Sequence, residues 1–145
     1  MASLNIDLSI ATNTTSTEYT YRDIKPEFTI NPTTNDIDVN DDYAAIEGGI
    51  YNMFLFKQGE RKINPEFGNS LYKYLYEGVT DLTANKIGNE IYTMFDRWEP
   101  RVKINDIKIT PDTDNNTYYI AILYSIPSLK DGAIKVFNVS VRARA

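Results

Sequence analysis

The sequence predicts an α+β fold in which two to three helices pack on one face of a C-terminal antiparallel meander of about three strands. The first observation is that apolar residues recur at helical spacing through the middle of the chain. The second is that apolar and polar residues alternate in segments between residues 101 and 143. The helical block precedes the strands as a whole, which favours α+β over alternating βαβ units.

The composition argues against several classes of function. The 145 residues contain no cysteine and no histidine, so disulfides, cysteine-bound zinc and a Ser-His-Asp triad are excluded. The net charge is −5 and lysine and arginine form no run, so a nucleic acid partner is not expected. No apolar run approaches the roughly 20 residues that a membrane helix needs, so a membrane partner is not expected either.

The chain is predicted to divide into an arm and one domain. Residues 1–40 are rich in Thr, Asn and Asp, which predicts an extended, partly irregular N-terminal arm. Lys25 precedes Pro26 and is therefore biased toward extended backbone. Residues 41–145 have the length and the apolar content of a single α+β domain.

A first helix is predicted to begin near Asn40 or Asp41, because either side chain can cap it. Gly48 and Gly49 each weaken this helix by about 1 kcal/mol relative to alanine. They are either a tolerated weakness or a place where a neighbouring element comes close, which a residue without Cβ permits. The apolar residues at helical spacing are Tyr43, Ile46, Ile50, Met53 and Phe54.

The next segment is predicted to be a loop followed by a short helix. Asn64 precedes a proline in residues 57–69, and Gly59 and Gly68 can take positive φ, all of which is typical of a loop. Residues 70–77 carry leucine and tyrosine on one side, which predicts the short helix.

A second long helix is predicted to start near Thr80 or Asp81 and to carry a fairly continuous apolar stripe. Pro100 pushes Glu99 toward extended geometry, so this helix should end at Trp98.

Three strands are predicted after the helices, at residues 101–110, 117–126 and 133–143. The alternation changes phase at Asn105-Asp106, which predicts a β-bulge there. The third strand is predicted to be a sheet edge that ends in two arginines. Charge at an edge either blocks unwanted pairing or marks an edge that receives a strand from a partner.

Few residues form a pattern that could carry chemistry. The carboxylates of Glu60, Glu66, Glu77 and Glu99 lie in or beside predicted loops, and a glycosidase needs a pair of carboxylates. An acidic chain offers such pairs by chance, so we expect these groups to be solvated. Residues 112–116 faintly resemble a calcium loop but lack its glycine and distal glutamate, so a hairpin turn is expected.

Glu99, Pro100 and Arg101 form a separate candidate site. In extended backbone Glu99 and Arg101 would point to the same side, about 6.6 Å apart, with a stiff proline between them. An exposed ion pair contributes only about 0–1 kcal/mol to stability, so stability is a weak reason for the pattern. The segment is either a helix stop or a charged display for docking, since arginine binds carboxylate through two parallel hydrogen bonds.

Several short motifs occur in a fixed order that resembles a known family. The motifs are G-E-R at 59–61, N-P-E-F-G at 64–68, L-Y-K-Y-L-Y-E at 71–77, T-D-L-T-A-N at 80–85 and W-E-P-R at 98–101. Together they are similar to the small baseplate wedge protein, or sheath initiator, of T-even-type contractile phages and the related component of type VI secretion systems. The resemblance covers residues 42–102 well, and the strands fit by pattern only.

The resemblance implies a structural protein of the virion tail baseplate, without catalysis and without a cofactor or metal. Glu99 and Arg101 would dock on the core bundle of two larger wedge proteins, with Pro100 holding their geometry. Arg61 and Glu66 would either brace their loop or touch a wedge subunit. The last strand would share strands with the tail sheath protein and template its first ring, with a contact surface that includes Val139, Val141 and Arg142.

Older descriptions of such proteins as lysozymes imply a rival function, a cell-wall hydrolase with a carboxylate pair. A hydrolase of this kind needs a cleft in which one carboxyl has a raised pKa. Nothing in the spacing of the acidic residues singles out such a pair. The structural reading is therefore preferred.

Overall fold

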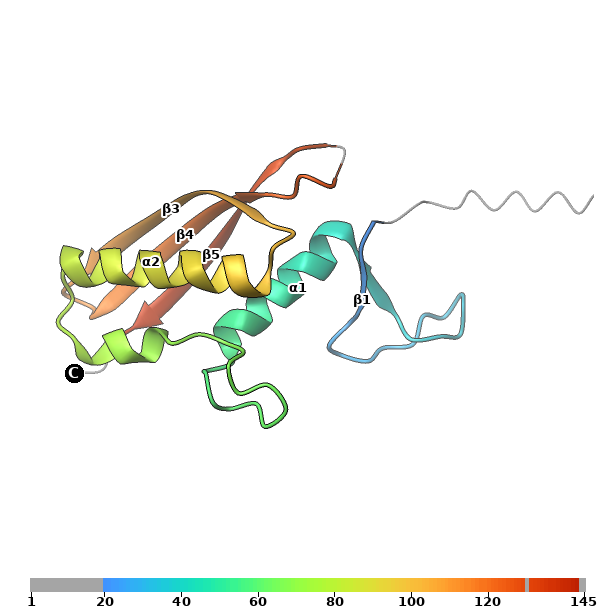
Figure 1. The fold of residues 1–145 in the computed structure, drawn as a ribbon. Coiled ribbons are helices and arrows are strands. Elements are labelled where there is room, and N and C mark those ends of the chain that lie inside the picture. Colours follow the sequence, from blue (N-terminus) through green and yellow to red (C-terminus); the bar gives the residue numbers. More distant parts are fainter. Residues whose placement is uncertain (1–19, 130, 144–145) are drawn as a thin grey trace, which may run out of the picture.

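The computed structural model describes residues 20–129 and 131–143 of the chain. Figure 1 shows a small strand pair, then helices, then a sheet, in the predicted order. The elements are β1 (Arg22–Ile24), β2 (Val39–Asp41), α1 (Asp42–Leu55), the 3-10 helix η1 (Leu71–Tyr76), α2 (Asp81–Trp98), β3 (Lys103–Asp112), β4 (Thr117–Ser125) and β5 (Ile134–Arg142).

The three C-terminal strands form the predicted antiparallel meander. Their order is β3-β4-β5, so β4 is central and β5 is an edge. The predicted bulge in β3 is confirmed, because Ile104 pairs with Tyr124 while Asp106 already pairs with Leu123. Asn105 is thus the extra residue, and it shifts by one position which side chains of β3 face the core.

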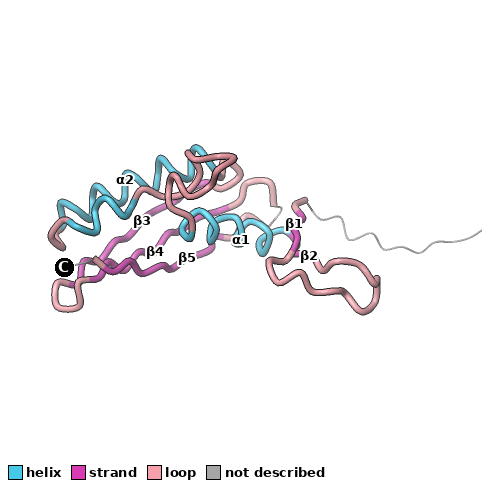
Figure 2. The backbone as a smooth tube through the Cα atoms, turned by 90° about the horizontal axis from the view of Figure 1, so that it is seen from below, coloured by secondary structure: helices cyan, strands magenta, loops and turns pink. Residues whose placement is uncertain are grey.

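The helices pack against one face of this sheet and enclose the core, which confirms the predicted fold class. Phe54 of α1 stacks on Phe137 of β5 with ring centroids 5.7 Å apart. Figure 2 shows α2 running along β3. The two elements come close at Gly88 of α2, where an added Cβ would lie 3.6 Å from Ile109 of β3. The most buried large side chains between the layers are Tyr118, Tyr124, Phe95, Ile46, Ile50, Met53, Ile87, Ile91, Ile122 and Ile126.

The predicted start of α2 and its predicted end at Trp98 are both confirmed. Thr80 caps it, and its side chain accepts a hydrogen bond from Thr83 N at 3.2 Å. The α1 helix also starts where expected, after Asp41, but the expected side-chain cap is absent there. The carboxylate of Asp41 instead binds Arg22 Nε at 2.8 Å, across the β1–β2 pair.

The described part of the predicted arm, residues 20–40, is more ordered than an irregular segment. The strands β1 and β2 pair in antiparallel fashion, and Ile30 bridges Ile37 between them. The loop between the strands projects away from the sheet in both views (Figures 1 and 2). Residues 1–19 lie outside the described residues, and the proposed division of the chain near residue 40 remains a prediction.

Candidate functional site

The segment Glu99–Pro100–Arg101 stops α2 and forms a tight turn, not the extended backbone considered for the alternative of a charged display. Glu99 N bonds to Phe95 O at 2.9 Å and closes α2. Val102 N then bonds to Glu99 O at 3.1 Å, which makes a β-turn with Pro100 in its second position. Proline suits that position because its φ is already near −65°, so the helix stop and the turn have one cause.

The turn brings Glu99 and Arg101 together as an ion pair. Arg101 Nε and Nη2 donate to the two carboxylate oxygens of Glu99 at 2.5 and 2.7 Å. The Glu99 side chain is only 5% exposed while that of Arg101 is 41% exposed, so the pair is not the surface pair that was expected. The hydrogen bond that Arg101 donates to Glu99 is also the main reason that the pKa of Arg101 is raised.

A glycine in α1 makes room for this buried carboxylate. A Cβ on Gly49 would lie 3.1 Å from Glu99 Oε2, whereas a Cβ on Gly48 would meet nothing within 4 Å. Each glycine therefore fits one of the two predicted explanations: Gly49 permits close approach, and Gly48 is tolerated. The Arg101 guanidinium also lies over the ring of Tyr21, 5.1 Å from its centroid, and so joins the arm to the turn.

The loop of residues 57–69 places Arg61 and Glu66 in intramolecular contacts. The Arg61 guanidinium lies between two aromatic rings, 4.6 Å from the centroid of Phe56 and 4.3 Å from that of Phe67. Glu66 forms an ion pair with Arg97 of α2. These contacts brace the loop, and direct contact of either residue with a wedge subunit stays a prediction.

The base of this loop is held by a residue that the sequence analysis did not single out. Asn69 Nδ2 donates to Phe54 O at 2.7 Å and to Phe56 O at 2.9 Å, which satisfies free carbonyls at the end of α1. Gly59 and Gly68 have φ of +93° and +110°, as predicted. At Gly68 a Cβ would lie 2.4 Å from Phe56 O, so only glycine fits.

The third candidate surface is the free edge of β5. The strand pairs with β4 alone, and no other described strand joins the sheet there. Val139 and Val141 lie opposite Ile120 and Tyr118 on the helix-covered face and are partly buried, while Arg142 is exposed.

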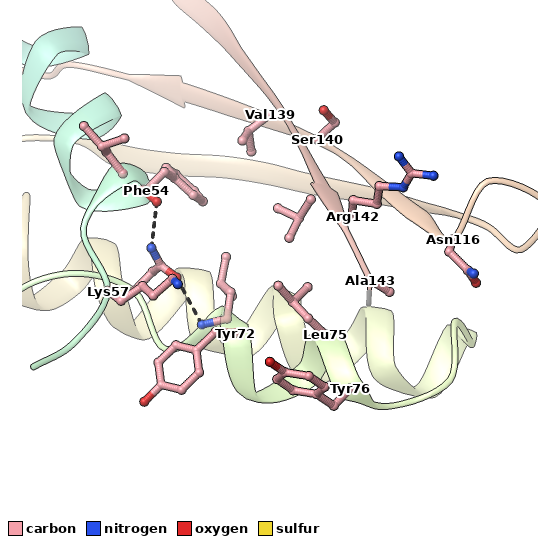
Figure 3. A pocket seen from close by; sticks show the side chains of 14 residues that line it. Phe54, Lys57, Tyr72, Leu75, Tyr76, Asn116, Val139, Ser140, Arg142 and Ala143 are labelled. Carbon is pink, nitrogen blue, oxygen red and sulfur yellow. Dashed lines mark hydrogen bonds between the residues drawn. The ribbon is translucent and has the colours of Figure 1, made fainter. Parts of the chain in front are cut away.

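A groove of about 850 Å³ runs beside this edge. Figure 3 shows β5 along one side, η1 along the other and the end of α1 at the left. The groove was not predicted, because its two walls come from segments far apart in the sequence. The residues of the helical walls are Phe54, Leu55, Leu71, Tyr72, Leu75 and Tyr76.

Other kinds of site receive no support from the described residues. No cluster of three or more Asp, Glu, His or Cys among residues 20–129 and 131–143 is arranged to hold a metal ion. Within the same residues, none of the helices has both the length and the apolar character needed to span a bilayer.

An α+β domain with a charged turn, a braced loop and an open strand edge has the features of a subunit that binds other proteins. The profile of the family "Baseplate wedge protein gp25" matches residues 40–129, and the chain belongs to this family. It is therefore a structural component of the baseplate wedge of a contractile tail and is located in the virion tail baseplate. The match ends before β5 and begins at the end of the arm.

Individual proteins are similar to the chain in sequence or in fold. The chain is 27% identical over 106 residues to baseplate wedge protein gp25 of Enterobacteria phage T4, covering 73% of this chain and 80% of that protein. Its fold is similar to that of a candidate tail lysozyme from Geobacter sulfurreducens, with a TM-score of 0.62, 21% identity and coverage of 69% of this chain and 89% of that one. A chain in the baseplate of the anti-feeding prophage gives a TM-score of 0.57 and 18% identity, covering 86% of this chain and 87% of that one.

Proposed function

We propose that the chain docks on a core bundle of two larger wedge proteins and templates the first ring of the tail sheath by sharing strands at β5. Docking is assigned to the turn at Glu99, Pro100 and Arg101. Templating is assigned to β5, including Val139, Val141 and Arg142. The observation that supports templating most is an edge strand with an open groove beside it.

Strand addition at β5 follows from backbone chemistry. An edge strand carries a row of N–H and C=O groups that no neighbour satisfies, and a strand from another protein can pair with them. The added strand would lie about 4.8 Å from β5, and its alternate side chains would enter the groove against η1. Main-chain bonds would then supply affinity, while Leu75 and Tyr76 of the groove wall would select apolar side chains.

The turn supplies a docking group of fixed orientation. Two of the five N–H donors of Arg101 are occupied by Glu99, and among residues 20–129 and 131–143 no acceptor takes the others, which could meet a carboxylate of a partner. Glu99 is buried against α1 and acts as the support of the guanidinium, not as a second contact group. Docking at this turn would therefore depend on Arg101 directly and on Glu99 through Arg101.

A seeding experiment tests the templating role. Leu55 and Tyr76 line the groove but are 56% and 71% exposed, so a lysine at either position should leave the core intact. We expect Leu55→Lys and Tyr76→Lys to reduce seeding of the same tail's sheath protein at least tenfold. Tyr92→Lys is the matched control, because Tyr92 is exposed on α2 and does not line the groove. Groove variants that seed as well as wild type would contradict templating at this edge.

The rival hydrolase function finds little support in the carboxylates. Glu60, Glu66, Glu77 and Glu99 each bind a different partner, respectively Lys57 N, Arg97, Lys86 and Arg101. Among the described residues, the carboxylates with a displaced pKa are Asp38, Asp112 and Asp131, and in each the pKa is lowered, mainly by a side-chain hydrogen bond. A general acid needs the opposite shift, so we favour a non-enzymatic role.

A further inference from the structure

The described part of the arm, residues 20–40, exposes several large apolar side chains. The segment lies almost wholly before the part of the chain that matches the family profile. Its loop projects away from the sheet, so the domain does not cover it (Figure 1). The exposed large apolar side chains of the arm are Ile24 at 50%, Phe28 at 70%, Ile30 at 67% and Ile37 at 44%.

The arm has a defined internal structure, so these side chains are held in place. Asp38 N bonds to Thr29 O at 2.7 Å, and Asn31 N bonds to Asp36 O at 2.8 Å. Lys25 and Asp38 add an ion pair at 2.5 Å across the arm. An apolar group on a fixed frame loses little conformational freedom when it binds, which favours affinity.

Phe28 is both the most exposed of these side chains and the most strained. Its φ is +50°, a left-handed conformation that is an outlier for a bulky residue with a Cβ. The strain arises where Phe28 N bonds to Lys25 O at 3.0 Å and closes a turn around Pro26. Because the ring is not buried, the fold does not recover the cost of this strain, and such outliers concentrate at functional sites.

Acidic residues frame the apolar side chains. Ile24, Phe28 and Ile37 directly follow Asp23, Glu27 and Asp36. These three carboxylates form no ion pair within the described part of the chain. An apolar centre with an acidic rim repels anionic lipid and nucleic acid, and it also repels the same arm on a second copy.

We propose that the arm is a docking element whose Phe28 ring, flanked by Ile30 and Ile37, enters an apolar pocket rimmed by lysine or arginine on a different baseplate subunit. Ile30 and Ile37 are bridge partners, so their side chains lie on one face of the arm. The strained aromatic would be the anchor, and Glu27 and Asp36 would meet the basic rim. The apolar site on the arm uses other residues than the turn and the β5 edge. The proposal therefore does not depend on the roles proposed for those surfaces and requires only that the chain is a baseplate component.

Two measurements test the proposal. In tails assembled with all their own subunits, Phe28→p-benzoylphenylalanine should crosslink on illumination to an apolar segment of another subunit that is flanked by lysine or arginine. A crosslink to residues 1–19 of the same chain, to a second copy, or to an acidic segment would overturn the proposal, as would the absence of any crosslink.

The second measurement separates docking from folding. Phe28→Gly removes the ring and relieves the strained φ, so the melting temperature of the free chain should equal or exceed that of wild type. Its incorporation into tails, and that of Glu27→Lys, should fall at least tenfold in competition with wild type. Asp114→Lys is the control, since it makes the same charge change in the exposed β3–β4 turn. Normal incorporation of Phe28→Gly would overturn the proposal.

Discussion

Glu99 and Arg101 show how one residue can support another at the proposed docking turn. The sequence identified both residues and the helix stop between them. It could not predict that Glu99 is buried, because the burial depends on Gly49 in a different helix. An uncompensated buried carboxylate is costly, so Arg101 stabilises the fold in addition to its proposed role in docking.

Replacing Arg101 with lysine tests this double role. Arg101→Lys keeps the charge but loses the two parallel hydrogen bonds to Glu99, so we expect a loss of about 1–2 kcal/mol in the free energy of unfolding and weaker docking on the wedge core. Arg97→Lys is the matched control, because the Arg97–Glu66 pair is exposed on both sides and should change stability by less than about 1 kcal/mol. Urea denaturation measures the free energy of unfolding of both variants. Equal losses would show that Glu99 does not depend on the guanidinium.

Tyr124 gives a prediction about alkaline stability. Its pKa is raised, first by burial and then by the hydrogen bond that its hydroxyl donates to Glu47 at 2.9 Å. Unfolded tyrosine ionises near pH 10, so above that pH the unfolded state binds fewer protons than the native state. This contribution to stability is complete below about pH 10 and is lost above it, by at most about 1.4 kcal/mol per pH unit.

The variant Tyr124→Phe cannot ionise at this position. Its free energy of unfolding should therefore fall less steeply than that of wild type between about pH 10 and 12, as measured by chemical denaturation at each pH. The other tyrosines are common to both proteins and cancel in the comparison. Equal slopes of the free energy of unfolding against pH in the two proteins would mean that Tyr124 ionises equally easily in the folded and unfolded states.

At the scale of elements, local signals were sufficient for most of the fold. The cap at Thr80, the end of α2 before Pro100 and the bulge at Asn105 each depend on a few adjacent residues, and the sequence predicted all three. The groove beside β5 could not be predicted, because its walls, η1 and β5, lie far apart in the sequence. The cap at Asp41 was mispredicted because its carboxylate binds Arg22 of the arm.

The two glycines of α1 allow a matched comparison within one helix. Gly48→Ala should raise the free energy of unfolding by about 0.5–1 kcal/mol, since alanine favours the helix and the added Cβ meets no neighbour. Gly49→Ala should gain less or lose stability, because its Cβ would press on Glu99 Oε2 at 3.1 Å. Thermal or urea denaturation of the two variants shows which of them is more stable. Equal gains would show that Glu99 moves aside freely.

At the scale of the whole molecule, the candidate surfaces lie toward two ends. Figure 1 places the arm at one end and the C-terminal end of β5 at the other. The turn lies beside the arm, because Arg101 packs over Tyr21. A molecule arranged in this way can hold the baseplate at one end while its sheet edge stays open for the sheath.

The contacts of the loop carboxylates predict that the chain does not hydrolyse cell wall. Purified protein incubated with peptidoglycan should release no more reducing sugar than buffer, because the loop carboxylates each bind a separate partner. Hen-type lysozyme activity under the same conditions is the positive control. Turnover that disappears in Glu77→Gln or Glu60→Gln would restore the hydrolase hypothesis.

The central claim, that β5 receives a strand from the sheath, is tested most directly by amide hydrogen exchange along Ile134–Arg142. The free chain and its complex with the same tail's sheath protein would be compared residue by residue. Pairing at the free edge should slow exchange at alternate amides of β5, since every second N–H of an edge strand points away from β4. If the complex forms and β5 amides exchange as fast as in the free chain, the sheath binds elsewhere and the claim is wrong.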